Sequence, residues 1–254
     1  MIPLKSKKEI EIMVEGGKRL RQVLEHVLKN LKPGITTLQL DKQAEEKILA
    51  FGGKPSFKMV PGYAWATCIT VNEEVVHGIP GERKIKEGDV VGVDMGMYYK
   101  GFHTDMAETI KIKNEKLKIK NEETERFLET GRKALEEAIK MAKAGNYLGQ
   151  ISKTIEGEIK KAGFSPVRAL TGHGIGRILH EEPQIPCFLE GRVEKTPKLK
   201  KGMTLAIEVI YNLGLPEVVL TSDGWTIKTK DGKISGLFEE TVAVTANDPL
   251  VLTK

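Results

Sequence analysis

Two aspartates lie where strand-like apolar sequence would carry acidic side chains into the interior. Asp94 ends the run Val90-Val-Gly-Val, and Asp105 lies in the strand-like segment 102–109. A hairpin turning at 99–100 places the two directly opposite each other, and a turn at 100–101 makes them diagonal neighbours on one face. Cross-strand Cβ atoms lie ~4.5–5.5 Å apart, and two carboxylates that close repel each other. The pair favours a bound cation; two exposed aspartates near a turn are the alternative.

Further acids and one histidine follow in the second part of the chain. Glu208 ends the apolar run 203–207, where an unpaired charge is costly. Glu239 and Glu240 are adjacent in a strand-like segment, so by alternation only one of them faces a given side. His173 lies in the glycine-rich sequence Thr171-Gly-His-Gly-Ile-Gly176. One histidine with four carboxylates from separate strands fits two divalent cations that share bridging oxygens and activate water, with Co, Mn, Fe, Ni or Zn as candidates.

Two more histidines stand in short polar motifs. His77 lies in Asn72-Glu-Glu-Val-Val-His-Gly-Ile-Pro80, and His180 lies in Leu179-His-Glu-Glu-Pro183. Either imidazole can form hydrogen bonds to a substrate amide or carbonyl during a reaction. A surface or helix-capping histidine is the alternative at both positions.

The elements that must position these residues begin with helices. Ser6-Lys-Lys-Glu9 predicts a capping box, and apolar residues at three- and four-residue steps over 10–31 predict the helix behind it. A shorter helix is expected over 38–50. The same pattern predicts a long helix from Phe127 that ends at Gly145, and a short one over 148–159 that ends at Gly163.

The chain repeats itself. Lys32, Gly34 and Gly52 recur 111 residues later as Lys143, Gly145 and Gly163, and His77-Gly-Ile79 recurs as His173-Gly-Ile175. The strand that ends in Asp94 recurs as the strand that ends in Glu208. The order predicts one domain built from two related halves, about 1–115 and 122–254, with a shared site on the pseudo-symmetry axis. Between them, 111–115 is repeated as 118–122, which indicates a solvated connection.

Two Asp-Gly dipeptides mark turns near the C-terminus. They are Asp223-Gly224 and Asp231-Gly232. The apolar, β-branched segments 218–220, 225–229 and 235–244 flank them. We expect these segments to be successive antiparallel strands.

These motifs together resemble type I methionine aminopeptidase. The resemblance rests on His77-Gly-Ile-Pro80, Val93-Asp94, Asp105-Met-Ala-Glu-Thr109, Gly172-His-Gly-Ile-Gly-Arg-Ile-Leu-His180-Glu-Glu-Pro183, Ile207-Glu208 and Phe238-Glu-Glu-Thr241, in order over nearly the whole chain. It implies the α/β pita-bread fold, in which two pseudo-symmetric halves surround a dinuclear metal site. It also indicates a short form without a cysteine-rich N-terminal extension.

The resemblance further implies a role for each residue of the motifs. Asp94 would chelate one metal, Asp105 and Glu239 would bridge both, and His173 and Glu208 would complete the shell of the second. Glu208 would also accept a proton from the attacking water, His77 would contact the substrate backbone, and His180 would stabilise the tetrahedral intermediate. A methionine pocket would use Tyr63, Cys68 and Trp225. Small second residues in the substrate would be favoured.

Three positions depart from the family pattern. Val209 replaces the usual proline after Glu208, which can alter the course of the strand. Glu240 replaces the usual His or Asp, which leaves open which glutamate is the ligand, although the preceding aromatic residue favours Glu239. Leu179 stands where an aromatic residue is common, which predicts a roomier pocket.

Composition limits the remaining possibilities. The 254 residues carry 40 Lys+Arg and 35 Asp+Glu, a net charge of +5, and two cysteines. No apolar run reaches the ~20 residues that a membrane span requires, and no secretory signal precedes the first helix. We expect a cytoplasmic monomer that acts on N-terminal Met peptides and nascent chains, with the ribosome surface as a possible partner. The alternatives are an X-Pro peptidase of the same fold and a non-catalytic module that binds ribosomes or RNA.

Overall fold

The computed structural model describes residues 2–113 and 122–254, so most of the charged repeat within 111–122 lies outside the described residues. The helices in the described part of the chain are α1 (Lys7–Asn30), α2 (Thr37–Ala50), α3 (Glu122–Lys140) and α4 (Leu148–Lys161), with short 3₁₀ turns at Phe57–Met59 and Val193–Lys195. The strands are β1 (Lys54–Pro55), β2 (Thr67–Val71), β3 (Glu74–Val76), β4 (Val90–Tyr99), β5 (Phe102–Lys111), β6 (Ser165–Pro166), β7 (Thr171–Gly174), β8 (Glu181–Pro186), β9 (Thr204–Asn212), β10 (Val218–Leu220), β11 (Ile227–Thr229), β12 (Ser235–Ala243) and β13 (Leu250–Val251).

α1 begins where its cap predicts, whereas α3 begins at Glu122, before the predicted start at Phe127. The Ser6 hydroxyl accepts the N–H of Glu9, and the Glu9 carboxylate accepts the N–H of Ser6, so the predicted capping box is confirmed. α2 and α4 also match their expected spans to within two residues. α3 ends at Lys140, earlier than predicted, because the N–H groups of Met141 and Ala142 bond three residues back and tighten the last turn.

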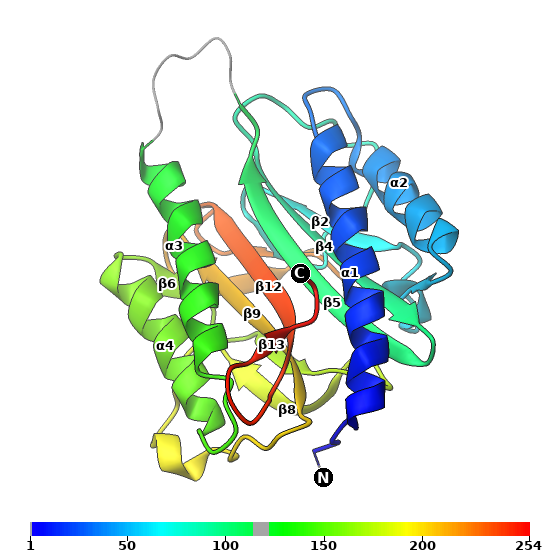
Figure 1. The fold of residues 1–254 in the computed structure, drawn as a ribbon. Coiled ribbons are helices and arrows are strands. Elements are labelled where there is room, and N and C mark those ends of the chain that lie inside the picture. The colour runs from blue at the N-terminus through cyan, green and yellow to red at the C-terminus, as the bar shows by residue number, and fades with distance from the viewer. Residues whose placement is uncertain (1, 114–121) are drawn as a thin grey trace.

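One large sheet forms the centre of the molecule. Its strands run in the order β1-β4-β5-β12-β9-β7-β8, with antiparallel pairing throughout. In Figure 1 the four helices lie on one face of this sheet, α1 and α2 to one side and α3 and α4 to the other, and the C-terminal segment runs between α1 and α3. α1 packs on β4 and β5, and α3 packs on β9 and β12. Each half of the sheet therefore has its own helix pair.

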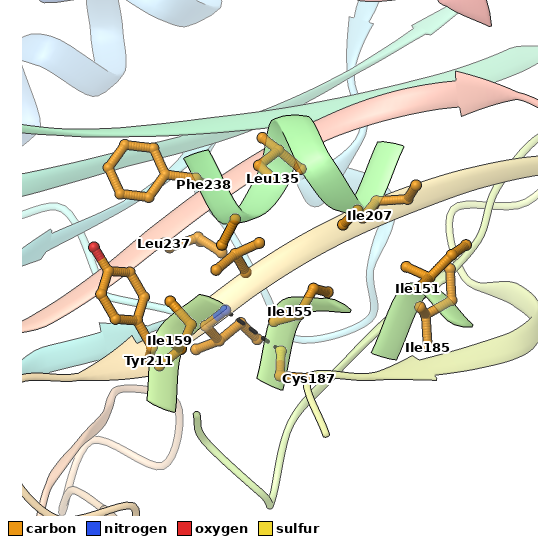
Figure 2. Packing of buried hydrophobic residues seen from close by; sticks show 14 of the residues in the cluster. Leu135, Ile151, Ile155, Ile159, Ile185, Cys187, Ile207, Tyr211, Leu237 and Phe238 are labelled. Carbon is orange, nitrogen blue, oxygen red and sulfur yellow. Dashed lines mark hydrogen bonds between the residues drawn. The ribbon is translucent and has the colours of Figure 1, made fainter. Parts of the chain in front are cut away.

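The helix-facing side of the sheet is apolar. Beneath α3 and α4, isoleucine and leucine side chains interlock with Tyr211 and Phe238 of the sheet (Figure 2). Phe127 stacks on Tyr211 at 4.2 Å between ring centroids, and the Tyr211 hydroxyl bonds to the Phe127 carbonyl. A matching cluster lies beneath α1 and α2. Because strand side chains alternate, the other face of the same strands is left for polar side chains.

The C-terminal strands are arranged differently from the sequence prediction. β10 pairs with β11 as expected, but β11 pairs next with β3 in a separate three-stranded sheet. β12 does not pair with β11; it lies between β5 and β9 in the main sheet. The prediction of one run of successive antiparallel strands was wrong, because the Asp231-Gly232 turn leads the chain out of the small sheet. β12 is buried along nearly its whole length, which suits a central strand.

No helix within the described residues is both long and apolar enough to cross a membrane.

Candidate metal centre

Three acids lie on one row that runs across four neighbouring strands of the sheet. Asp94 on β4 is opposite Ala107 on β5, Ala107 is opposite Glu239 on β12, and Glu239 is opposite Glu208 on β9. The small Ala107 separates the carboxylate of one half from the two of the other. Strand pairing alone therefore brings the predicted acids of both halves together.

A second row, two residues along, adds the remaining donors. Asp105 is opposite Gly96, so it is the diagonal neighbour of Asp94 on the same face. The turn falls at Lys100-Gly101, both with positive φ (47° and 96°), which confirms the second of the two predicted hairpins. A Cβ at Gly96 would lie 3.3 Å from the Asp105 carboxylate and 2.7 Å from the Ser56 Cβ. Only glycine leaves that space open.

His173 joins this row from the other half. His173 lies on β7 opposite Ala206, and Ala206 precedes Glu208 by two residues on β9. The His173 Nε2 is 3.7 Å from the Glu208 Oε1. Its Nδ1 lies 2.8 Å from the Gly174 carbonyl, so Nδ1 carries the proton and Nε2 presents its lone pair. Donor atoms of Asp105, His173 and Glu239 all lie within 4.8 Å of one another. This is the arrangement in which histidine binds metals.

Burial and mutual repulsion disfavour the charged form of the acids in the cluster, and a bound cation would offset both. Burial raises the pKa of Asp94 to about 8. Burial, with repulsion from the neighbouring carboxylates, raises the pKa values of Asp105, Glu208 and Glu239 well above their usual range. The Asp94 Oδ1 and the Glu239 Oε1 are buried and have no hydrogen-bond partner within the described residues. Oxygen-rich donors with unpaired buried atoms fit divalent metal ions.

Glu240 faces away from this cluster. Its carboxylate pairs with Arg21 of α1 and accepts the Thr253 hydroxyl on the helix side of the sheet. Strand alternation thus separates the two adjacent glutamates, and the structure places Glu239 with the other donors. Of the two glutamates, only Glu239 lies on the same row as Asp94 and Glu208.

Threonine hydroxyls form hydrogen bonds to the backbone across β5 and β12, where the two halves meet. The Thr241 hydroxyl on β12 accepts the N–H of Asp105 at 2.8 Å and donates to the Asp105 carbonyl at 2.7 Å. The Thr109 hydroxyl on β5 makes the same two contacts with Leu237. Both threonines are buried. This pairing cannot be predicted from the sequence, because threonine is common in strands for other reasons.

A cavity of about 140 Å³ opens beside the donor cluster. The three residues predicted for a methionine pocket, Tyr63, Cys68 and Trp225, all line it, and the rings of Tyr63 and Trp225 meet edge to face at 5.1 Å. Its apolar wall also includes Phe57, Val60 and Val76, which sequence reasoning missed, and Leu179, which it flagged only as a departure. Phe57 belongs to a short 3₁₀ turn, where no periodicity marks the inward-facing residue.

His77 and His180 stand at the mouth of this cavity. Both also line a wider groove of about 630 Å³ that continues past His173 and Glu208. His77 has a positive φ of 56°, an uncommon conformation for a side-chain-bearing residue that recurs at functional sites. Partial desolvation lowers the pKa of both imidazoles. Each is therefore mostly neutral at pH 7 and has one N–H to donate.

Val209 leaves the strand undisturbed. The register of β9 with β12 runs without a break from Thr204 to Asn212, with Val209 opposite Phe238. Val209 is fully buried in the core. The missing proline therefore has no visible effect on the course of β9 beside Glu208.

Comparison with known proteins identifies the family. The model of metallopeptidase family M24 matches residues 11–246. The chain belongs to metallopeptidase family M24. M24 relatives include the methionine aminopeptidase of Clostridium perfringens, 42% identical over 253 residues that cover 100% of this chain and 99% of the relative. Methionine aminopeptidase 1 of Bacillus subtilis is 40% identical over the full length of both chains.

Solved structures agree with this M24 assignment. The methionine aminopeptidase of Thermotoga maritima is 41% identical, with a TM-score of 0.95 and full coverage of both chains. The prolidase of Pyrococcus horikoshii is 22% identical, with a TM-score of 0.78, and covers 99% of this chain but 63% of its own. The latter likeness concerns the fold alone. The α/β pita-bread architecture expected from the sequence is confirmed.

Proposed function

We propose that this M24 metallopeptidase removes the N-terminal methionine from peptides and newly made proteins, with a preference for a small second residue. The observation that carries the proposal is the five-donor cluster beside a small cavity with an apolar wall, in a chain similar over its whole length to methionine aminopeptidases. Binding of a free amino terminus beside the cavity would limit cleavage to a single residue.

The metal ligands in this proposal are Asp94, Asp105, His173, Glu208 and Glu239. Two bound divalent ions supply an activated water nucleophile and charge stabilisation for hydrolysis. Glu208, beside His173 at the cavity mouth, is placed to take the proton of the attacking water. His180 donates a hydrogen bond to the developing oxyanion, and His77 holds the substrate backbone on the opposite side.

The cavity limits the first residue of the substrate by volume and polarity. An apolar cavity of ~150 Å³ accommodates benzene, so the 140 Å³ here accepts one medium-sized side chain. Cys68 and the aromatic rings of Tyr63 and Trp225 are polarizable walls that suit a thioether. Charged side chains would lose their solvation in it and be rejected.

We further propose a cytoplasmic monomer that meets nascent chains. The net charge of +5 supports weak attraction to anionic surfaces such as the ribosome. The groove that continues from the cavity leaves room for the rest of the polypeptide. Co-sedimentation with ribosomes at low and high salt would test the association, because electrostatic binding weakens as salt increases.

Two other functions fit the fold less well. An X-Pro peptidase shares the architecture, but here the similarity to prolidases is below 25% identity. A non-catalytic module has no need for a cluster of four carboxylates and a histidine, in which Asp105, Glu239 and His173 are buried at a large desolvation cost.

The test is peptide cleavage by metal-stripped protein before and after addition of Mn, Fe or Co. The substrates are Met-Ala-Ser, Met-Leu-Ser, Leu-Ala-Ser and Ala-Pro-Ser. Metal-dependent release of methionine from Met-Ala-Ser alone supports the proposal. Cleavage of Ala-Pro-Ser instead would make the protein an X-Pro peptidase. No metal binding and no cleavage would favour the non-catalytic module.

A further inference from the structure

A buried ion pair lies beside the catalytic cleft without touching the metal-binding residues. It joins Lys5, which precedes α1, to Glu181, the first residue of β8. The two side chains are 1% and 4% exposed. Burying both charges carries a large desolvation cost, so the pair is a weak source of net stability. Its contacts indicate a role in positioning.

Glu181 holds the loop that precedes it. Its Oε1 accepts the N–H of Arg177 at 2.8 Å and the N–H of Ile178 at 3.4 Å, while its Oε2 binds the Lys5 ammonium. The same loop carries Leu179, which lines the cavity, and His180, which stands at its mouth. One carboxylate therefore connects Lys5 to the backbone of Arg177 and Ile178, in the loop that leads to His180.

Lys5 is itself held in place. Its backbone N–H donates to the Gly202 carbonyl at 2.7 Å. Its aliphatic stem lies directly against the loop, because a Cβ at Gly176 would be 2.2 Å from the Lys5 Cε and 3.0 Å from the Glu181 Oε1. The lysine stem thus occupies the space that any side chain at 176 would need.

The nearby arginine does not substitute for Lys5. The guanidinium of Arg177 pairs with Glu9 of α1 and lies over the Phe102 ring, 5.7 Å from its centroid. Its side chain is 51% exposed, whereas Lys5 and Glu181 are enclosed. Loss of Lys5 would leave the Glu181 carboxylate buried without its cation and would favour its movement toward water.

We propose that Lys5, acting through Glu181, is a positioning residue for His180. The pair fixes the loop 176–180 so that the imidazole keeps its place over the cavity. The role of His180 in this inference rests on the proposed aminopeptidase function. The segment before α1 thereby has a part in catalysis, although Lys5 touches neither substrate nor metal.

A double-mutant cycle between Lys5→Met and His180→Ala tests the proposal. Lys5→Met is expected to lower kcat for Met-Ala-Ser by about 10- to 100-fold, since small misplacements of a catalytic group have effects of that size. In the His180→Ala background the same change is expected to have almost no further effect, because it acts through that histidine. A full, independent loss of kcat in that background would overturn the proposal.

Matched variants separate positioning from stability. Lys7→Met is the control, since the Lys7 side chain is 93% exposed, and it is expected to leave kcat unchanged. Lys5→Met/Glu181→Gln carries no unpaired buried charge and keeps an oxygen for the loop N–H groups, so most of kcat should return. Lys5→Met/Glu181→Met lacks that oxygen and should not recover. Equal recovery in both double variants would contradict the proposed role of Glu181.

Hydrogen exchange gives a readout that is independent of activity. The amides of Arg177 and Ile178 should exchange faster in Lys5→Met than in the wild type or Lys7→Met, while Mn²⁺ affinity stays the same. If Lys5→Met does not fold, the Lys5→Met/Glu181→Met variant is compared with Lys5→Met/Glu181→Gln. Unchanged exchange would overturn the positioning role. A wild type that binds Mn²⁺ but cleaves no Met peptide would refute the proposed function instead.

Discussion

The two halves of the molecule supply the acids of the site from differently connected strands. The N-terminal half contributes Asp94 and Asp105 from one hairpin, β4–β5. The C-terminal half contributes Glu208 and Glu239 from β9 and β12, which are paired strands but not consecutive ones. The short acids thus lie on the locally closed hairpin, whereas the longer acids lie on strands joined by the excursion through β10 and β11. The two halves therefore differ in how their strands are connected and in the length of their acidic side chains, although all four acids lie in one site.

The repeated histidine shows the same divergence. His173 is 8% exposed, and its Nδ1 is fixed by the Gly174 carbonyl so that Nε2 faces the acids. His77 has the same His-Gly-Ile sequence in the first half, but it lies after β3, outside the strand β2 that pairs with β4. Its φ is 56°, and it lines the cavity. Two copies of one His-Gly-Ile sequence therefore lie in different surroundings, one among the buried acids and one beside the cavity.

The halves are tied together by crossed contacts on the helix side. Arg21 of α1 pairs with Glu240 of β12, and Arg132 of α3 pairs with Glu108 of β5. Each helix thereby reaches the strand of the other half. Arg21 and Arg132 are 111 residues apart, the same offset that relates the two helix pairs. The Thr109 and Thr241 hydroxyls add a matching pair on the other face.

Removing one acid from each half should have the largest effect. Asp105→Asn and Glu239→Gln are each expected to reduce turnover of Met-Ala-Ser by about 10³-fold or more, because each removes a proposed bridging charge. Steady-state kinetics with added Mn²⁺ measures the loss, and circular dichroism checks the fold. A fully active Asp105→Asn variant would refute the dinuclear centre.

The two histidines of the repeated His-Gly-Ile sequence should respond differently. His173→Ala is expected to weaken Mn²⁺ binding, measured by calorimetry, and to lose turnover with it. His77→Ala is expected to keep its Mn²⁺ affinity while kcat/KM falls about 10²-fold, since it removes one hydrogen bond to the substrate. Equal loss of metal affinity in both variants would show that the repeated motif has not diverged in function.

The acids of both halves should make the metal-free protein less stable as pH rises. Their folded pKa values are raised, to about 8 for Asp94, so the folded state keeps protons that the unfolded state releases above pH ~4. The stability present at low pH is therefore lost progressively between about pH 4 and 8, by up to ~1.4 kcal/mol per pH unit for each such group.

Thermal denaturation checks this dependence. The Tm of the metal-free protein should fall from pH 5 to pH 8, and Mn²⁺ should raise Tm more at pH 8 than at pH 5. Asp105→Asn should raise the Tm of the metal-free protein at pH 8, since it removes one of the repelling charges. A flat profile would mean that the acids do not carry raised pKa values.

The smallest expected difference concerns the threonines that join the halves. Thr241→Val and Thr109→Val each remove a hydroxyl that bonds to a neighbouring strand, so each should cost about 1–3 kcal/mol of unfolding free energy. Only Thr241 contacts the backbone of a proposed ligand, Asp105. Mn²⁺ affinity should therefore fall several-fold in Thr241→Val and stay constant in Thr109→Val, with Thr241→Ser as the rescue. Equal Mn²⁺ affinities in the three variants would show that the Thr241 hydroxyl does not position Asp105 for metal binding.

Sequence reasoning succeeded where local rules decide the structure. The Ser6–Glu9 capping box follows from spacing alone. Hairpin geometry limits Asp94 and Asp105 to an opposite or a diagonal pair, and the structure has the diagonal one. Alternation along β12 separated Glu239 from Glu240 before their partners were known.

It failed where partners are distant in the chain. The Asp231-Gly232 sequence predicts a turn between paired antiparallel strands. A turn sequence does not determine which strand the following segment pairs with, and β12 inserts between β5 and β9. Lys5 and Glu181 are 176 residues apart, and nothing in either local sequence indicates the other. Phe57 and Val60 reach the cavity from irregular backbone, for which periodicity carries no information.

The central place of β12 has a consequence for how the chain reaches its native state. Until this late strand arrives, β5 and β9 each expose an unpaired edge, and the two parts of the sheet are unconnected. Contacts of such long sequence separation form slowly, and open edges in the meantime favour association with other chains. Strand insertion, rather than helix formation, should limit the rate of folding, and chains that end before residue 235 should aggregate.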